Sequence, residues 1–124
     1  MLVNRLHDFL NKNNVFYKFQ YGFRRGCGTT TAITEIVDDI IHGIDNKIIV
    51  GALFLDLKKA FDTIDHNILL RKLNTYGIRG VANDILRSYL SGRQQFVSVN
   101  NAKSTMRPIN IGVPQGSNIG PLLF

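Results

Sequence analysis

The apolar run Ile48–Leu55, which ends at Asp56, constrains the fold of this chain more than any other feature. Because apolar residues occupy both alternating positions of the run, it predicts a central strand that is covered on both faces. Such a strand would deliver the carboxylate of Asp56 to its C-terminal end. A carboxylate in that place is a common way to hold a catalytic magnesium ion.

Helical periodicity and turn residues predict most of the other elements. Apolar side chains recur at helical spacing over residues 2–12, 33–44, 66–76 and 82–90, and Asp65 is a plausible N-cap for the third of these helices. Two strands are expected at 93–99 and 106–111, with Asn100 and Asn101 at the bend between them. Residues 15–28 predict a loop, and a last helix is expected to begin near Ser117. Together these elements predict an α+β fold.

Composition limits the class of protein. A chain of 124 residues suits one domain with a modest core, and its single cysteine, Cys27, cannot form an intramolecular disulfide. No apolar run is long enough to span a bilayer, and no signal pattern opens the chain. These features indicate an intracellular protein without a membrane partner, and they leave cytoplasm and nucleus both open.

The net charge of +6 is unevenly distributed along the chain. Residues 1–30 carry five Lys or Arg and one acid, residues 31–66 carry three and seven, and residues 67–124 carry seven and one. Basic flanks around an acidic middle suit a phosphate polymer with a metal site close to it. A merely solvated basic surface explains the same charge pattern.

Three residues that follow the apolar run are the main candidates for a role in metal or nucleotide binding. Asp56, with the backbone carbonyl of Leu57 beside it, offers the oxygen ligands that magnesium requires, although a strand-terminal Asp also caps turns. Phe61 stands where a ring could lie under an incoming sugar and exclude a 2′-hydroxyl, or could simply fill a core. Taken alone, neither feature decides between the functional assignment and its structural alternative.

The downstream motif Pro114-Gln115-Gly116 predicts a tight turn that lets a ligand approach the backbone closely. The amide of Gln115 could then hydrogen-bond a nucleotide or a template, whereas the same turn could be purely structural.

Cationic candidates lie in two places. Arg24 and Arg25 follow an aromatic segment, so their guanidinium groups could grip phosphates beside stacked bases. Lys58 and Lys59 follow Asp56 directly and could face nucleic acid. Exposed basic residues without a ligand are the alternative at both places.

The order and spacing of these motifs closely resemble one family. The matching segments are Gln20–Arg24, Phe54–His66, Tyr76–Gly80, Ser88–Leu90, Arg93–Gln95, Gly112–Ser117 and Gly120–Phe124. They resemble the reverse transcriptase of non-LTR retrotransposons, the jockey-like and CR1-like elements. The resemblance implies an incomplete right-hand polymerase, with a fingers-like segment at 1–46, a partial palm at 47–124, and helices packed on a partial antiparallel palm sheet.

The resemblance also implies roles for individual residues. Asp56 matches the first metal-binding carboxylate, and Phe61 matches the sugar-discriminating aromatic. Gln115 and Gly116 match the loop that meets nucleotide and template, and Arg24 falls in a fingers motif. The implied cofactor is magnesium or manganese in the complete domain. The implied partners are an RNA template, a DNA primer and deoxynucleoside triphosphates.

The family's paired aspartates are expected beyond Phe124, so the chain is expected to be a fragment that does not polymerise DNA alone. Two other functions stay open from sequence. One is a non-catalytic RNA- or DNA-binding remnant, and the other is an inert relic of a mobile element.

Overall fold

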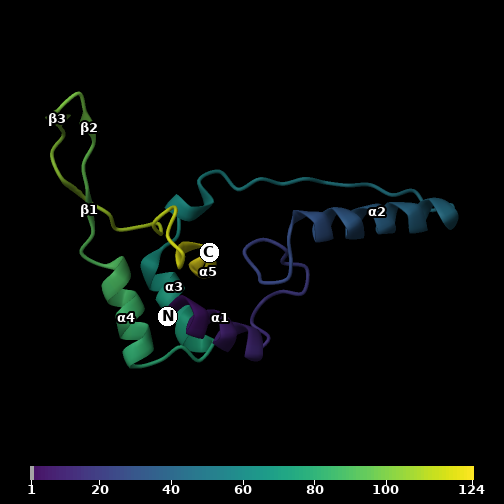
Figure 1. The fold of residues 1–124 in the computed structure, drawn as a ribbon, viewed down its shortest axis with the longest axis horizontal. Coiled ribbons are helices and arrows are strands. Elements are labelled where there is room, and N and C mark those ends of the chain that lie inside the picture. The colour runs from purple at the N-terminus through teal and green to yellow at the C-terminus, as the bar shows by residue number, and fades with distance from the viewer. Residues whose placement is uncertain (1) are drawn as a thin grey trace. The chain divides into compact units, whose positions relative to one another are not determined.

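The computed structural model describes residues 2–124, and it divides the chain into two compact units, Met1–Leu57 and Lys58–Phe124 (Figure 1). The first compact unit includes the extended segment that follows the second helix. The division at 46/47 that the resemblance implies stays a prediction. The assignment of the two parts to fingers and palm stays a prediction.

Two helices form the first unit, as the periodicity predicted. They are α1 (Leu2–Lys12) and α2 (Thr29–Asp45), and residues 15–28 between them form the expected loop. Leu6 and Leu10 on α1 are buried, and the ring of His7 lies 5.3 Å from that of Phe16. The apolar stripe of α2 is present in sequence, but its members are exposed: Ile33, Ile36, Val37, Ile40, Ile41 and Ile44.

The predicted central strand at 48–55 is wrong. The segment turns back onto the end of α2, where Ile48 N donates to Gly43 O at 2.8 Å and the side chain of Val50 packs against Gly43. Beyond that turn the backbone is extended but forms no strand, and Phe54 is 82% exposed. A strand requires a neighbour for its N–H and C=O groups. Within residues 2–124, no segment pairs with 51–57.

Helices and one 3₁₀ turn form the body of the second unit. They are η1 (Ala60–Asp62), α3 (His66–Thr75), α4 (Val81–Leu90) and α5 (Gly120–Leu123). Asp65 Oδ1 accepts hydrogen bonds from the backbone N–H groups of Asn67 and Ile68 at 2.8 and 2.9 Å, which confirms it as the N-cap of α3. The last helix begins at Gly120 rather than near Ser117, because Ser117 Oγ instead accepts from Gly120 N.

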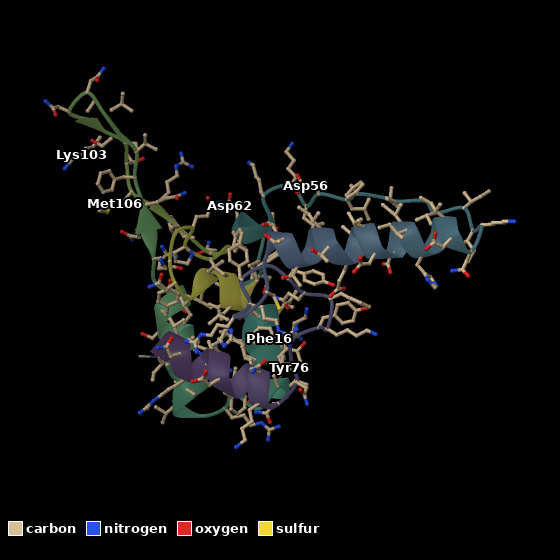
Figure 2. The ribbon with its side chains drawn as sticks, turned by 45° about the vertical axis from the view of Figure 1, so that its right-hand side comes forward. Phe16, Asp56, Asp62, Tyr76, Lys103 and Met106 are labelled. Atoms are coloured by element: carbon tan, nitrogen blue, oxygen red, sulfur yellow. The ribbon has the colours of Figure 1, made fainter. Side chains whose placement is uncertain are left out.

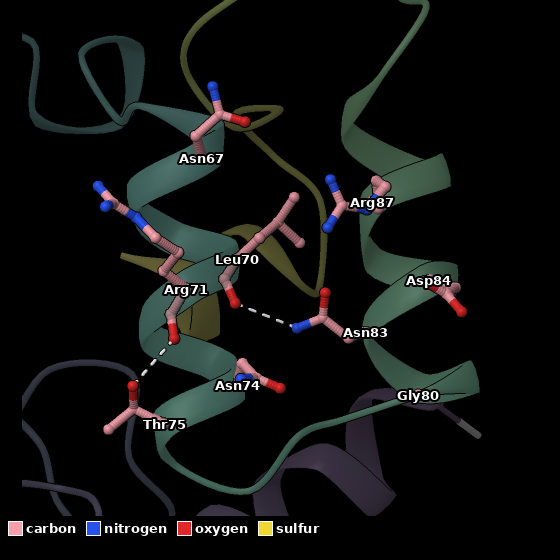
Figure 3. Close-up of a pocket in the computed structure, with 9 residues that line it drawn as sticks. All are labelled: Asn67, Leu70, Arg71, Asn74, Thr75, Gly80, Asn83, Asp84 and Arg87. Atoms are coloured by element: carbon pink, nitrogen blue, oxygen red, sulfur yellow. Dashed lines mark hydrogen bonds between the residues drawn. The ribbon is translucent and has the colours of Figure 1, made fainter.

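The α3 and α4 helices pack side by side, and a buried amide joins them (Figure 3). Asn83 Nδ2 donates to Leu70 O at 3.1 Å and to Ile78 O at 3.0 Å. The apolar side chains buried in this unit are Leu69, Leu70, Leu73, Ile78, Leu86, Leu90, Val113, Ile119 and Leu123. The two helices thus supply most of the buried core of the second unit.

An antiparallel ribbon projects from these helices (Figures 1 and 2). Strand β1 (Gln94–Gln95) pairs with β4 (Arg107–Pro108), and β2 (Ser98–Val99) pairs with β3 (Ala102–Lys103). The bend is at Asn100 and Asn101, as predicted, and both have positive φ angles (46° and 64°), as a two-residue hairpin turn requires. The strands are shorter than expected, and β3 was not anticipated. The α+β class is confirmed, whereas the right-hand polymerase fold stays a prediction.

Candidate nucleotide-binding site

The segment around Phe61 and the segment around Gln115 lie against each other in the second unit. Val113 N donates to Phe61 O at 2.8 Å, and Gly112 N donates to Ile64 O at 2.7 Å. His66 Nε2 donates to Gly112 O at 2.7 Å. Two motifs that are far apart in sequence are therefore held together by three hydrogen bonds.

The close approach of these segments depends on Gly112. Its φ angle is +84°, and a Cβ atom placed on it would lie 2.9 Å from Asp62 O and 3.0 Å from Asp62 Cα. Only glycine combines that backbone conformation with so little space. The sequence motif Gly-Val-Pro-Gln-Gly thus begins with a residue that the packing demands.

A side-chain hydrogen bond also links the two segments. Gln115 Nε2 donates to Asp62 Oδ1 at 2.9 Å, across 53 positions of sequence. Sequence reasoning did not assign any role to Asp62, and its only signal was its place directly after Phe61. The contact identifies Asp62 as the residue that orients the amide of Gln115.

Phe61 is half-buried on η1, and its ring lies 5.0 Å from the ring of Phe124. A contact of this kind stabilises packing. It is compatible with both interpretations of Phe61, the sugar-discriminating ring and the core aromatic.

A groove of about 790 Å³ opens beside this junction, and we call it the Gln115 groove. Residues 108–114 line one part of it, and its other lining residues are all polar: Lys59, Asp62, Thr63, Arg93, Gln95 and Gln115. Lys59 has a φ angle of 56° at the start of η1, and Lys58 before it is exposed. Two cations and several amide side chains around one groove are suited to a ligand with both phosphate and hydrogen-bonding groups.

Asp56 and Leu57 belong to the first unit and lie in its exposed extended segment (Figure 2). No group of three or more His, Cys, Asp or Glu side chains that could hold a metal ion occurs within residues 2–124. Asp56 is therefore a single carboxylate, and the described residues do not by themselves fit a divalent metal, which requires several oxygen ligands.

The two arginines of the loop between α1 and α2 are engaged by neighbouring groups. Arg25 contacts Asp8 Oδ1 at 3.3 Å and donates to Asn4 Oδ1 at 2.7 Å, while Arg24 donates to Tyr17 O at 3.4 Å. Both contacts of Arg25 tie the loop to α1. Because the Arg25–Asp8 pair is exposed, it competes only weakly with a phosphate ligand.

The same loop is also tied to α2 at one point. The hydroxyl of Tyr21 donates to the carboxylate of Glu35, and this hydrogen bond raises the pKa of Tyr21 to about 12. The segment that carries Arg24 and Arg25 is therefore anchored to both helices of the first unit.

Comparison with known proteins identifies the family to which the chain is similar. The family model described as reverse transcriptase (RNA-dependent DNA polymerase) matches residues 1–124. The probable RNA-directed DNA polymerase from transposon BS of Drosophila melanogaster is 34% identical over the whole chain, which corresponds to 14% of that protein. The RNA-directed DNA polymerase from mobile element jockey of the same species is 35% identical over the whole chain and 13% of its own length.

No solved structure matches the chain significantly. The chain spans about one seventh of the length of the curated relatives it matches. Within residues 2–124, no helix is both long enough and apolar enough to cross a membrane. The match of the family model over every residue confirms the resemblance that the motifs indicated, and the chain belongs to the reverse transcriptase family.

Proposed function

We propose that this chain is part of an RNA-directed DNA polymerase of a retrotransposon and that the Gln115 groove receives the incoming deoxynucleotide. The observation that carries the proposal is the hydrogen bond between Gln115 and Asp62, which joins two family motifs at one groove. The RNA template and the DNA primer are the proposed macromolecular partners.

Each candidate residue has a proposed role. In the groove, Lys59 and Arg93 contact phosphate oxygens, and Phe61 on the adjoining turn excludes a 2′-hydroxyl. Gly116 has a φ angle of 76° and no atom within 4 Å of the place of a Cβ, so its backbone is open to a ligand. Outside the groove, Arg24, Arg25 and Lys58 contact nucleic acid.

Asp56 and the carbonyl of Leu57 are proposed as ligands of a divalent metal, magnesium or manganese. Their carboxylate and carbonyl oxygens are of the kind that these ions prefer. When bound, such an ion would neutralise charge on a triphosphate. Among residues 2–124, no group of three or more His, Cys, Asp or Glu side chains completes such a site.

The contact with Asp62 determines which end of the Gln115 amide meets the ligand. A carboxylate only accepts hydrogen bonds, so the amide nitrogen must face Asp62. The amide oxygen is then left for the ligand, which must supply a donor such as a sugar hydroxyl or a base amino group. By holding the amide nitrogen, Asp62 makes the Gln115 side chain favour ligands that donate a hydrogen bond to its oxygen.

Titration of the purified chain with dTTP tests the proposal. We expect the backbone amide signals of Lys59, Arg93, Gln115 and Gly116 to shift together in nuclear magnetic resonance spectra. Asp62→Ala releases the Gln115 amide, and this loss of about 1 kcal/mol should weaken dTTP binding about fivefold.

The matched control is Asp38→Ala, which removes the same charge from an exposed position on α2. It should leave dTTP binding within twofold of the unchanged chain. Shifts confined to residues outside the Gln115 groove, or equal effects of the two variants, would contradict the proposed nucleotide site.

Primer extension is expected to fail with this chain alone. We expect no magnesium-dependent incorporation of dTTP on a poly(rA) template with an oligo(dT) primer, because one carboxylate cannot position two metal ions. The jockey polymerase, assayed in parallel, serves as the positive control. Clear incorporation by the purified chain would show that its own residues complete a catalytic site.

A non-catalytic nucleic-acid-binding function is the second candidate. It is favoured by the charge of residues 85–124, which carry four Lys or Arg and no acid. Binding of this kind depends on salt and should survive Asp56→Ala, because phosphate contacts dominate it.

A further inference from the structure

A second groove of the second unit lies between α3 and α4 and has a volume of about 610 Å³ (Figure 3). We call it the α3–α4 groove. It shares no lining residue with the Gln115 groove. Its lining is almost entirely polar, since the one large apolar residue there, Leu70, is buried in the core.

One side of the α3–α4 groove is a row of polar side chains on α3. Asn67, Arg71 and Asn74 recur at intervals of four and three, so they lie along one face of the helix. The row is about 10 Å long at 1.5 Å per residue. All three are exposed, and no hydrogen bond or ion pair engages their side-chain polar groups within residues 2–124.

The other side of the groove carries a second guanidinium group. Arg87 extends from α4 toward α3, as Figure 3 shows, and it is exposed. Asp84 is the one acid in the lining, and it forms no ion pair with either arginine within the described chain. The two guanidinium groups therefore remain available to an anionic ligand, and the lining has a net charge of one positive unit.

We infer that the α3–α4 groove binds the phosphodiester backbone of a single-stranded nucleic acid. Guanidinium groups bind phosphates through paired hydrogen bonds, and the amides of Asn67 and Asn74 can pair with sugars or base edges. A row about 10 Å long is longer than one phosphate group, so a polymer with successive phosphates fills it better than one phosphate ion.

An acidic protein segment fits the groove less well. Protein interfaces depend on buried aromatic or apolar anchors, and the one large apolar side chain in the lining, Leu70, is already buried in the core. The inference goes beyond the proposed polymerase function, because it requires neither the Gln115 groove nor a nucleotide or metal ion.

The test measures binding of the full chain to a fluorescein-labelled uridine 20-mer RNA by anisotropy, in EDTA and over a range of potassium chloride concentrations. Arg71→Ala/Arg87→Ala should weaken binding at least tenfold. It should also reduce the slope of log affinity against log salt by about 1.4, the value for two phosphate contacts on a single strand.

The matched control is Lys12→Ala/Lys72→Ala, which removes two exposed charges outside the groove, one of them directly beside Arg71. It should weaken binding less than threefold. Asp84→Asn removes the acid from the lining and should strengthen binding about threefold, because a like charge next to the phosphates is lost. Circular dichroism of each variant checks that the helices are retained.

Equal losses in the two double variants would overturn the inference, because they would assign binding to diffuse charge. Competition by polyglutamate at the same charge concentration as RNA would also overturn it, since the groove would then not prefer nucleic acid. If dTTP fails to shift the signals of the Gln115 groove, only the proposed polymerase function is contradicted, because the RNA measurement contains no free deoxynucleoside triphosphate.

Discussion

Gly112→Ala is expected to separate the Gln115 segment from the Phe61 turn. The added methyl group would lie 2.9–3.1 Å from three backbone atoms of Asp62, so no side-chain rotation can relieve the contact. The positive φ angle adds a conformational cost of about 1–2 kcal/mol for any residue with a Cβ. Together, clash and conformation should lower the free energy of unfolding by about 3 kcal/mol.

Urea denaturation measures that loss, and Gly92→Ala is the matched control. Gly92 also has a positive φ angle (68°), but no atom lies within 4 Å of the place of its Cβ. It should therefore show the conformational cost without the clash. Equal destabilisation by the two substitutions would mean that the contact between Gly112 and Asp62 does not hold the site together.

Leu90→Ala is expected to have a similarly large effect on the core of the second unit. Leu90 is 0% exposed on α4, so the substitution leaves a cavity among neighbours that cannot close it fully. Losses of about 2–5 kcal/mol are typical of such a change. Thermal unfolding followed by circular dichroism should show a clear fall in the midpoint temperature.

The control on the same helix is Val81→Ala, at a position that is 76% exposed. Its effect should stay within about 0.5 kcal/mol, as for most surface substitutions. If Leu90→Ala were as mild as this control, the α3–α4 pair would not be the stable centre of the unit. The α3–α4 groove would then lack a rigid support.

Local chemistry explains why most helices could be predicted from the sequence. Asp65 binds the free N–H groups at the start of α3, and this capping depends only on residues close in sequence. The hairpin bend at Asn100 and Asn101 is another local choice, because asparagine tolerates positive φ angles. Elements of this kind need no distant partner to form.

The apolar run 48–55 shows where sequence reasoning failed. Its residues have strong strand preference, yet Leu53, Phe54 and Leu55 are all more than four-fifths exposed. Preference for a strand becomes a strand only when another segment pairs with it, and pairing is decided outside the run itself. The sequence of the run predicted its extended backbone but not its surroundings.

The candidate site divides in the same way. Phe61, Gln115 and Gly116 were proposed from the sequence because they lie in motifs that resemble the family's, and their roles stay predictions. Family membership is what the sequence by itself determined, along with most of the helices and the hairpin bend. Only the tertiary structure revealed that Asp62 orients the Gln115 amide and that Arg71 and Arg87 line one groove. The physical reason is that caps and turns arise from neighbours in sequence, whereas these contacts depend on how distant segments pack.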